Sequence, residues 1–159
     1  MNDEQQDRTG ACVDMLVLEN QFCFALYSAS HAMTKTYKPL LDRLGLTYPQ
    51  YLVMLVLWQH DGLLVKDIGA RLFLDSGTLT PLLKRLEAGG LLARRRDPRD
   101  ERQVRISLTG AGRALRAQAR EIPEQLLCAS GLELEALGRI RAELAKLRAD
   151  LLEALAKAG

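Results

Sequence analysis

The chain has 159 residues, the usual length of one domain. Hydrophobic residues make up 48% of it and charged residues 26%, a composition that supports a globular core and excludes a disordered tail or linker. Its apolar runs are far shorter than the roughly 18 residues of a membrane-spanning helix, and the first ten residues are polar where a signal peptide has an apolar run. We therefore expect a cytoplasmic protein without a membrane partner.

The cysteine and histidine content gives no sign of a metal site. Cys12, Cys23 and Cys128 are too few and too far apart for a zinc cluster or a disulfide scaffold, and the two histidines are not spaced as a ligand pair. The serine and aspartate residues form no recognisable nucleophile motif. We expect no metal, no cofactor and no enzyme active site, so any role of the cysteines is that of single thiols.

Two helices are predicted in the first part of the chain. Apolar residues recur at three- and four-residue steps, Cys23 among them, and predict an amphipathic helix over about 14–33. Thr47 can cap a second helix, and residues 51–58 are apolar nearly all round, which is typical of a buried helix. Turn residues at 60–62 end this second helix.

Two short helices joined by a tight turn are predicted next. The apolar spacing over 65–72 fits a short helix in which Gly69 allows close packing. Residues 75–78 supply oxygens that can cap another helix, which the glycine pair 89–90 ends. This arrangement is typical of a helix-turn-helix, whose second helix, about 75–88, enters the major groove of DNA. The residues of that helix expected to contact DNA are Ser76, Thr78, Thr80, Lys84 and Arg85.

A β-hairpin with a charged tip is predicted to follow. Residues 91–96 and the alternating segment 103–108 predict two strands, joined by a tip at 97–102. Eight basic residues lie between 84 and 105 against four acidic ones, so positive charge is concentrated there as in a nucleic-acid interface. The alternative for the arginines of the first strand is a solvated edge that discourages aggregation. Asp100 is expected to pair with a nearby arginine, because phosphate would repel it. The wing residues expected to reach the DNA backbone or the minor groove are Arg96, Arg99 and Arg102.

The last third of the chain predicts two more helices. Thr109 can cap one that runs to about Cys128, and leucines and an isoleucine form a stripe over 137–155 on a terminal one. A small winged domain offers these helices no partner, so we infer that, with the first helix, they bury their stripes against a second copy of the chain. The expected fold class is all-α with a small β-hairpin wing. The expected organisation is one domain, 1–159, with dimerisation helices at 14–45 and 110–159 and a winged helix-turn-helix DNA-binding part at 48–108.

Two stretches of sequence resemble a known family. The tip Asp97-Pro98-Arg99-Asp100-Glu101-Arg102, followed by a strand and Leu108-Thr109, resembles the wing signature of the MarR family of dimeric winged-helix repressors. The segments 18–30 (LENQFCFALYSAS) and 46–52 (LTYPQYL) are similar to the OhrR-type organic hydroperoxide sensors of that family. The resemblance extends from about residue 15 to the end of the last helix. It implies a homodimeric repressor that binds a palindromic operator in double-stranded DNA and has an organic hydroperoxide as its inducer.

The resemblance also implies roles for particular residues. Cys23 corresponds to the cysteine that peroxide oxidises, and Tyr37 and Tyr48 correspond to two tyrosines that hold its thiolate. Cys128 is similar in placement to a late resolving cysteine. An intersubunit disulfide between Cys23 and Cys128 would then release the operator. The resemblance gives no role to Cys12.

Helix geometry limits where Tyr37 can meet the thiol. Cys23 and Tyr37 are fourteen residues apart, which is roughly 21 Å along one continuous helix. A bend at Pro39 would come after both residues and would not bring them together. A contact with the cysteine of the other subunit is the option that fits the resemblance.

Simpler interpretations and two rival functions stay open. Cys23 alone fits a small buried hydrophobe on a helix face, and Cys128 fits one more residue of an apolar stripe. A repressor of the same fold could be released by a small aromatic ligand bound between the dimer arms. A thiol peroxidase could use the same two cysteines, but it would consume many equivalents of peroxide. The residues expected in the core are Tyr27, Tyr51 and Trp58, and those expected at the surface or in hinges are His31 and His60.

Overall fold

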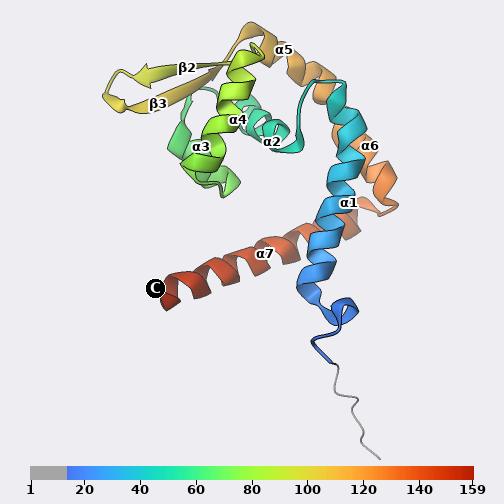
Figure 1. Cartoon of the computed structure of the whole chain (residues 1–159). Coiled ribbons are helices and arrows are strands. Elements are labelled where there is room, and N and C mark those ends of the chain that lie inside the picture. Colours follow the sequence, from blue (N-terminus) through green and yellow to red (C-terminus); the bar gives the residue numbers. More distant parts are fainter. Residues whose placement is uncertain (1–13) are drawn as a thin grey trace, which may run out of the picture. The chain divides into compact units, whose positions relative to one another are not determined.

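The computed structural model describes residues 14–159, which form helices and one small antiparallel sheet (Figure 1). Cys12 lies outside the described residues. The chain divides into two compact units, Met1–Lys35 and Thr36–Gly159. The expected fold class, all-α with a β-hairpin wing, is confirmed. No helix within 14–159 is long and apolar enough to cross a membrane.

The first helix does not have the predicted bounds of 14–33. A short 3-10 helix, η1 (Leu18–Asn20), comes first, and the extended backbone of Gln21 separates it from α1 (Phe22–Asp42). Pro39 lies inside α1 and has no N–H to donate to the carbonyl one turn earlier. α1 ends at Asp42, and in the turn that follows the left-handed φ of Gly45, 67°, lets the N–H of Leu46 bond back to the carbonyl of Leu41. The stop signal was therefore this glycine and not a change in periodicity.

α2 (Tyr48–Gln59) is the buried helix that the sequence predicts. The hydroxyl of Thr47 accepts from the backbone N–H of Gln50, and the side chain of Gln50 accepts from the backbone of Thr47 at 2.8 Å, which completes a capping box. Val53, Met54 and Leu57 are almost fully inaccessible to solvent. α2 is thus the centre of the core of the second unit.

α3 (Val65–Leu72) and α4 (Ser76–Ala88) form the predicted helix-turn-helix. Asp75 caps α4 by accepting the backbone N–H of Thr78 at 2.8 Å. Gly69 allows the turn to pass close to α3, because a Cβ there would lie 2.6 Å from the carbonyl oxygen of Leu74. One face of α4 is buried, and the opposite face is left for another function. The buried residues of α4 are Leu79, Leu83 and Leu86.

The sheet has the order β1-β3-β2 and is antiparallel throughout. β1 (Leu63–Leu64) was not predicted, whereas β2 (Leu92–Asp97) and β3 (Asp100–Leu108) form the predicted hairpin. The turn at the tip is shorter than the six residues expected, because Asp97 pairs with Asp100 and only two residues remain between the strands. Ile106 is fully buried beneath the sheet.

The predicted helix from Thr109 to Cys128 is two helices, α5 (Gly110–Ala119) and α6 (Ile122–Ser130). Pro123 lies in the first turn of α6, and it lacks the N–H that a continuous helix would donate to the carbonyl of Ala119. The predicted cap by Thr109 is confirmed, since its hydroxyl accepts from the backbone N–H of Gly112 at 3.0 Å.

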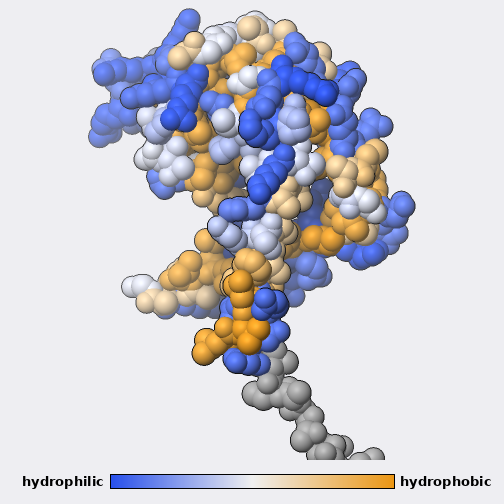
Figure 2. Space-filling model, turned by 45° about the vertical axis from the view of Figure 1, so that its right-hand side comes forward, coloured by the Kyte–Doolittle hydropathy of each residue, from blue (hydrophilic) through white to orange (hydrophobic). Residues whose placement is uncertain are grey.

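The last helix, α7 (Leu134–Ala158), buries none of its residues in the single chain. Its predicted apolar stripe is present but faces solvent, with Ile140, Leu144, Leu151 and Leu155 between 40% and 69% exposed. Figure 2 shows exposed hydrophobic side chains in orange in the lower part of the view. An amphipathic helix with an exposed stripe is typical of one that packs against another chain.

Gly112→Ala should lower the free energy of unfolding by about 1–3 kcal/mol, because the added methyl group would overlap the carbonyl oxygen of Leu91. Gly138→Ala in α7 is the matched control, since nothing lies within 4 Å of its Cβ and alanine favours a helix by about 1 kcal/mol. Urea unfolding of both variants checks this. Equal or greater stability of Gly112→Ala would contradict the close approach of α5 to Leu91.

Candidate nucleic-acid interface and thiol site

The exposed face of α4 carries the predicted hydroxyls and cations. Ser76, Lys84 and Arg85 are exposed, and Thr80 is half-buried. Thr78 is exposed too, but its hydroxyl donates to the carboxylate of Asp75 at 3.1 Å, so it also belongs to the cap. The backbone N–H of Thr78, followed by its hydroxyl, lowers the pKa of Asp75, and the cap is therefore charged at neutral pH.

The wing presents its cations to solvent, as the sequence predicts. Arg96 and Arg99 are exposed, and the side chain of Arg102 is 91% exposed. The arginine run in β2 is not uniform, because Arg94 is half-buried and lies 3.6 Å from Glu87 of α4. Figure 2 shows long hydrophilic side chains in blue in the upper part of the view.

A groove of about 290 Å³ joins the wing to the helix-turn-helix. Ser76 and Thr80 of α4 line one side of it, and Arg102 of β3 lines another. Lys66, near the start of α3, also lines this groove. Its place there was not predicted from the sequence. The buried Nε of Arg94 has no hydrogen-bond partner among the described residues. Two hydroxyl-bearing residues of α4 and the wing cation Arg102 therefore line the same concave surface.

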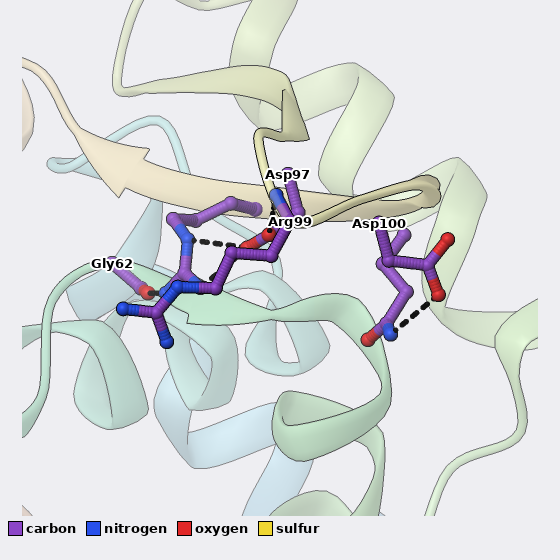
Figure 3. A network of polar contacts seen from close by, with 6 residues as sticks. Gly62, Asp97, Arg99 and Asp100 are labelled. Atoms are coloured by element: carbon purple, nitrogen blue, oxygen red, sulfur yellow. Dashed lines mark hydrogen bonds and ion pairs between the residues drawn. The ribbon is translucent and has the colours of Figure 1, made fainter.

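Asp97 anchors the tip end of the hairpin (Figure 3). It is 4% exposed, and it accepts hydrogen bonds from the backbone N–H of Arg99 at 2.8 Å and from Nε of Arg105 at 3.0 Å. Arg105 also donates to the carbonyl of Gly62, in the turn after α2. The N–H of Arg99, followed by the Arg105 guanidinium, holds the pKa of Asp97 below its usual value. Asp97 lies in the predicted tip, but its contact with Arg105 was not predicted, because only the fold brings these two side chains together.

Asp100 has the structural role that the sequence predicts. Its carboxylate accepts from Nε of Arg102 at 3.1 Å and from the side-chain amide of Gln103 at 3.0 Å. The Gln103 amide, followed by the Arg102 side chain, lowers the pKa of Asp100. Asp100 thus orders the start of β3 next to the cations.

Tyr37 of α1 and Tyr48 of α2 lie against each other, with ring centroids 4.7 Å apart. Tyr51 completes the cluster, 5.9 Å from the Tyr37 ring and 6.5 Å from the Tyr48 ring. Burial, together with the two neighbouring phenols, raises the pKa of Tyr37 to about 12, and burial raises the pKa of Tyr48 as well. Both phenols therefore keep their protons at neutral pH and can act as hydrogen-bond donors.

The two described cysteines are free thiols on exposed positions. Cys23 lies in the first turn of α1 within the first unit, and Cys128 lies in the last turn of α6 within the second. The helix that carries Cys128 ends at Gly131, whose φ is 64°, so the predicted break beside this cysteine is confirmed. No group of three or more metal-binding side chains gathers within residues 14–159.

The aromatic residues expected in the core are not all buried. Tyr51 is 2% exposed, and Trp58 packs against it and donates from Nε1 to the carbonyl of Gly112 at 2.8 Å. Tyr27 is 59% exposed in the single chain, so its assignment to the core was wrong. Its ring contacts His31 one turn later, with centroids 4.2 Å apart. The expected surface position of the histidines is confirmed, because His31 and His60 are both exposed.

A helix-turn-helix followed by a cation-rich two-stranded wing defines the chain as a winged-helix transcriptional regulator. The family model described as Transcriptional regulator SarA/Rot matches residues 35–118. Over 131 residues the chain is 53% identical to the organic hydroperoxide resistance transcriptional regulator of Bacillus subtilis (strain 168), a match that covers 82% of this chain and 89% of that protein. The chain belongs to the MarR-type family of winged-helix transcriptional regulators, as the sequence resemblance implies.

Solved structures of AbfR, a protein of Staphylococcus epidermidis, have the same fold. Reduced AbfR bound to DNA matches with a TM-score of 0.69 at 38% identity, over 85% of this chain and 94% of that one. Overoxidised AbfR bound to DNA matches with a TM-score of 0.69 at 38% identity, over 84% and 94%. Disulfide-formed AbfR matches with a TM-score of 0.57 at 36% identity, over 87% and 92%. AbfR has thus been solved in three redox forms.

Asp97→Asn should lower the midpoint of thermal unfolding at pH 7, because an amide cannot replace the carboxylate beside Arg105. Since folding lowers the pKa of Asp97, its stabilising contribution is complete above the unfolded value of about 3.9 and is lost as the pH falls through the folded value. The difference between the midpoints of the variant and the wild type should therefore begin to shrink as the pH falls below about 4 and should disappear below the folded pKa of Asp97.

Glu101→Gln, an exposed carboxylate in the same hairpin, is the matched control for charge. It should leave the midpoint at pH 7 nearly unchanged. Equal midpoints for Asp97→Asn and Glu101→Gln at pH 7 would show that the Asp97 network does not stabilise the wing.

Proposed function

We propose that this protein is a homodimeric repressor that binds a palindromic operator and releases it when an organic hydroperoxide oxidises Cys23. The observation that carries the proposal is the contact between Tyr37 and Tyr48, which brings together two protonated phenols from different helices. The 53% identity with an organic hydroperoxide resistance regulator supports the same chemistry. DNA binding is supported by the structures of reduced AbfR and of MepR with DNA.

The DNA-binding part would be the winged helix-turn-helix at 48–108. α4 enters the major groove and presents its hydroxyls and cations to base edges and phosphates. The wing reaches the backbone or the adjacent minor groove. The proposed contacts are Ser76, Thr78, Thr80, Lys84, Arg85, Arg96, Arg99 and Arg102.

The dimer would be built from the helices at 14–45 and 110–159. α7 buries none of its residues in one chain, and residues such as Leu16 and Phe22 of the first unit are also exposed. A second copy covers both apolar surfaces and places two α4 helices on one duplex. A two-fold dimer of this kind requires a palindromic site.

The sensing reaction is a two-electron oxidation of the Cys23 thiolate. The sulfur attacks the terminal oxygen of the hydroperoxide, so that an S–O bond forms, the O–O bond breaks, and the leaving alkoxide takes a proton from solvent to become the alcohol. The thiolate of Cys128 in the partner subunit then attacks the sulfenic sulfur, so that an S–S bond forms, the S–O bond breaks, and the leaving hydroxide takes a proton from solvent to become water. The phenols of Tyr37 and Tyr48 donate hydrogen bonds to the Cys23 thiolate. α1 is continuous from Phe22 to Asp42, and the fourteen residues from Cys23 to Tyr37 advance roughly 21 Å along it, so in this dimer Tyr37 reaches the Cys23 thiolate of the partner subunit. Tyr48 reaches the same thiolate because its ring lies against that of Tyr37.

Release depends on the disulfide and not on oxidation alone. AbfR is known both reduced and overoxidised on DNA, and separately in a disulfide-formed state. An oxidised sulfur confined to one helix leaves the two α4 helices free to keep their spacing. A bond between Cys23 and Cys128 pulls α1 of one subunit toward α6 of the other and changes that spacing.

Arg99→Ala and Arg102→Ala should each weaken DNA binding and reduce the slope of log affinity against log salt by about 0.9, the change for one lost phosphate contact. The probe is a duplex that the wild-type protein selects from a random pool. Arg139→Ala is the matched control, because Arg139 pairs with a nearby carboxylate as Arg102 does but lies on α7. An unchanged slope in both wing variants would place the wing away from DNA.

Replacing Tyr37 and Tyr48 together with Phe should slow oxidation of Cys23 by roughly five-fold or more, which corresponds to the loss of one net hydrogen bond of about 1 kcal/mol. Only hydroxyls are removed, so the fold and the DNA affinity of the reduced protein should be retained. Stopped-flow oxidation with an organic hydroperoxide measures the rate. Tyr51→Phe is the control from the same cluster, and an equal rate in the double variant and this control would make Tyr37 and Tyr48 packing residues.

The disulfide mechanism is tested with single cysteine variants. After peroxide treatment, non-reducing electrophoresis should show a covalent dimer for the wild type and for Cys12→Ser, but not for Cys23→Ser or Cys128→Ser. Cys23→Ser should stay on DNA at any sub-denaturing dose. Cys128→Ser should still react at Cys23, overoxidise and also stay on DNA. A dimer band lost in Cys12→Ser and Cys23→Ser but kept in Cys128→Ser would show that Cys12 is the resolving thiol.

A further inference from the structure

Phe73 occupies the turn between α3 and α4 in a backbone conformation that favours glycine. Its φ of 56° and ψ of 37° lie in the left-handed region, and no other non-glycine residue in 14–159 has a positive φ. This conformation lets its N–H bond to the carbonyl of Gly69 and end α3. Glycine or asparagine would end the helix in this conformation with less strain. We therefore expect the role of the aromatic side chain to lie in the contacts that it makes.

The side chain of Phe73 does not pack in the core, because this residue is 57% exposed. Its ring is covered by the guanidinium of Arg148, whose central carbon lies 4.1 Å from the ring centroid. This is a cation–π contact, and both residues belong to the second unit. Arg148 forms no ion pair within the described residues. The contact joins the turn of the helix-turn-helix to α7, 75 positions later in the chain (Figure 1).

Arg148 lies beside the apolar stripe of α7. Leu144 is one turn before it and Leu151 one turn after it, and both are exposed in the single chain. In the proposed dimer a second copy covers this stripe. α7 would then contact the partner along its stripe and its own helix-turn-helix through Arg148. Because α4 begins three residues after Phe73, this contact lies between the dimer interface and the recognition helix.

We propose that Phe73 and Arg148 are positioning residues for DNA recognition, which hold the helix-turn-helix against α7 so that the dimer sets the direction of α4. The proposal rests on the proposed function, because it takes α7 to be part of the dimer interface. Neither residue contacts DNA. They act through the orientation of α4, and a palindromic site requires both α4 helices to be oriented together.

The test compares Arg148→Gln and Phe73→Leu with Arg141→Gln, which removes the same charge two turns earlier on α7. The probes are a palindromic duplex selected by the wild-type protein from a random pool and a duplex with one half-site. Arg148→Gln and Phe73→Leu should each weaken palindrome binding by about two- to five-fold, the size of an exposed cation–π contact. Half-site affinity and the salt slope should stay at the wild-type values, since no phosphate contact is lost.

Two further variants separate a pair from two independent effects. The double variant should bind no more weakly than either single variant, because both remove the same contact. Phe73→Tyr keeps the ring and should bind as the wild type does. Palindrome affinity of Arg148→Gln equal to that of Arg141→Gln, or multiplied effects in the double variant, would overturn the proposal. Sedimentation of the reduced wild type as a monomer, or failure to select a palindrome, would instead overturn the proposed function on which it rests.

Discussion

The burial of α2 on nearly all sides is the constraint on which the rest of the structure depends. Val53, Met54 and Leu57 are at most 1% exposed, and a fully buried side chain of this kind stabilises the fold by about 1.5–3 kcal/mol. At its start α2 carries Tyr48 and Tyr51, and near its end Trp58 donates to the carbonyl of Gly112 in α5. Two of the three clustered tyrosines and the contact with α5 therefore belong to one buried helix.

The turn after α2 extends this connection to the sheet. Asp61 accepts the backbone N–H of Leu108 at 2.7 Å and pairs with Arg113 of α5 at 2.8 Å. Gly62 accepts from Arg105, which in turn holds Asp97 at the tip end of the hairpin. Hydrogen bonds and ion pairs therefore connect the end of α2 to α5, to the sheet and to the tip of the hairpin.

Local signals in the sequence predicted most of the fold. The capping residues Thr47 and Asp75 and the close-packed Gly69 contact backbone groups only a few residues away. Their roles can therefore be predicted from the local sequence. The local sequence did not predict a feature when that feature depends on a residue far away in the chain, or when a helical pattern of apolar residues continues across a break. The helix from Thr109 to Cys128 was predicted unbroken because the apolar pattern hid the effect of Pro123. Asp97 does lie in the predicted tip, but its burial was not predicted, since it depends on Arg105 across the hairpin.

Some residues of the candidate site could be predicted from the sequence itself, others only from the family resemblance, and one not at all. The cations of the wing followed from charge alone, and their exposure agrees with that. The pairing of Tyr37 with Tyr48 came only from the family resemblance, because no spacing rule relates the end of one helix to the start of the next. Lys66 was missed, since a single lysine at the start of a helix is unremarkable until the fold places it in the groove with Arg102.

The central claim is that one oxidation event at Cys23 switches DNA binding, and a titration of the reduced protein tests it most directly. The protein is bound to its selected palindromic duplex, treated with one equivalent of an organic hydroperoxide per thiol pair, and then treated with a dithiol reductant. The account predicts tight binding, release after the single equivalent, and recovery after reduction. Binding that stays unchanged after peroxide has consumed Cys23 and formed the covalent dimer would contradict it.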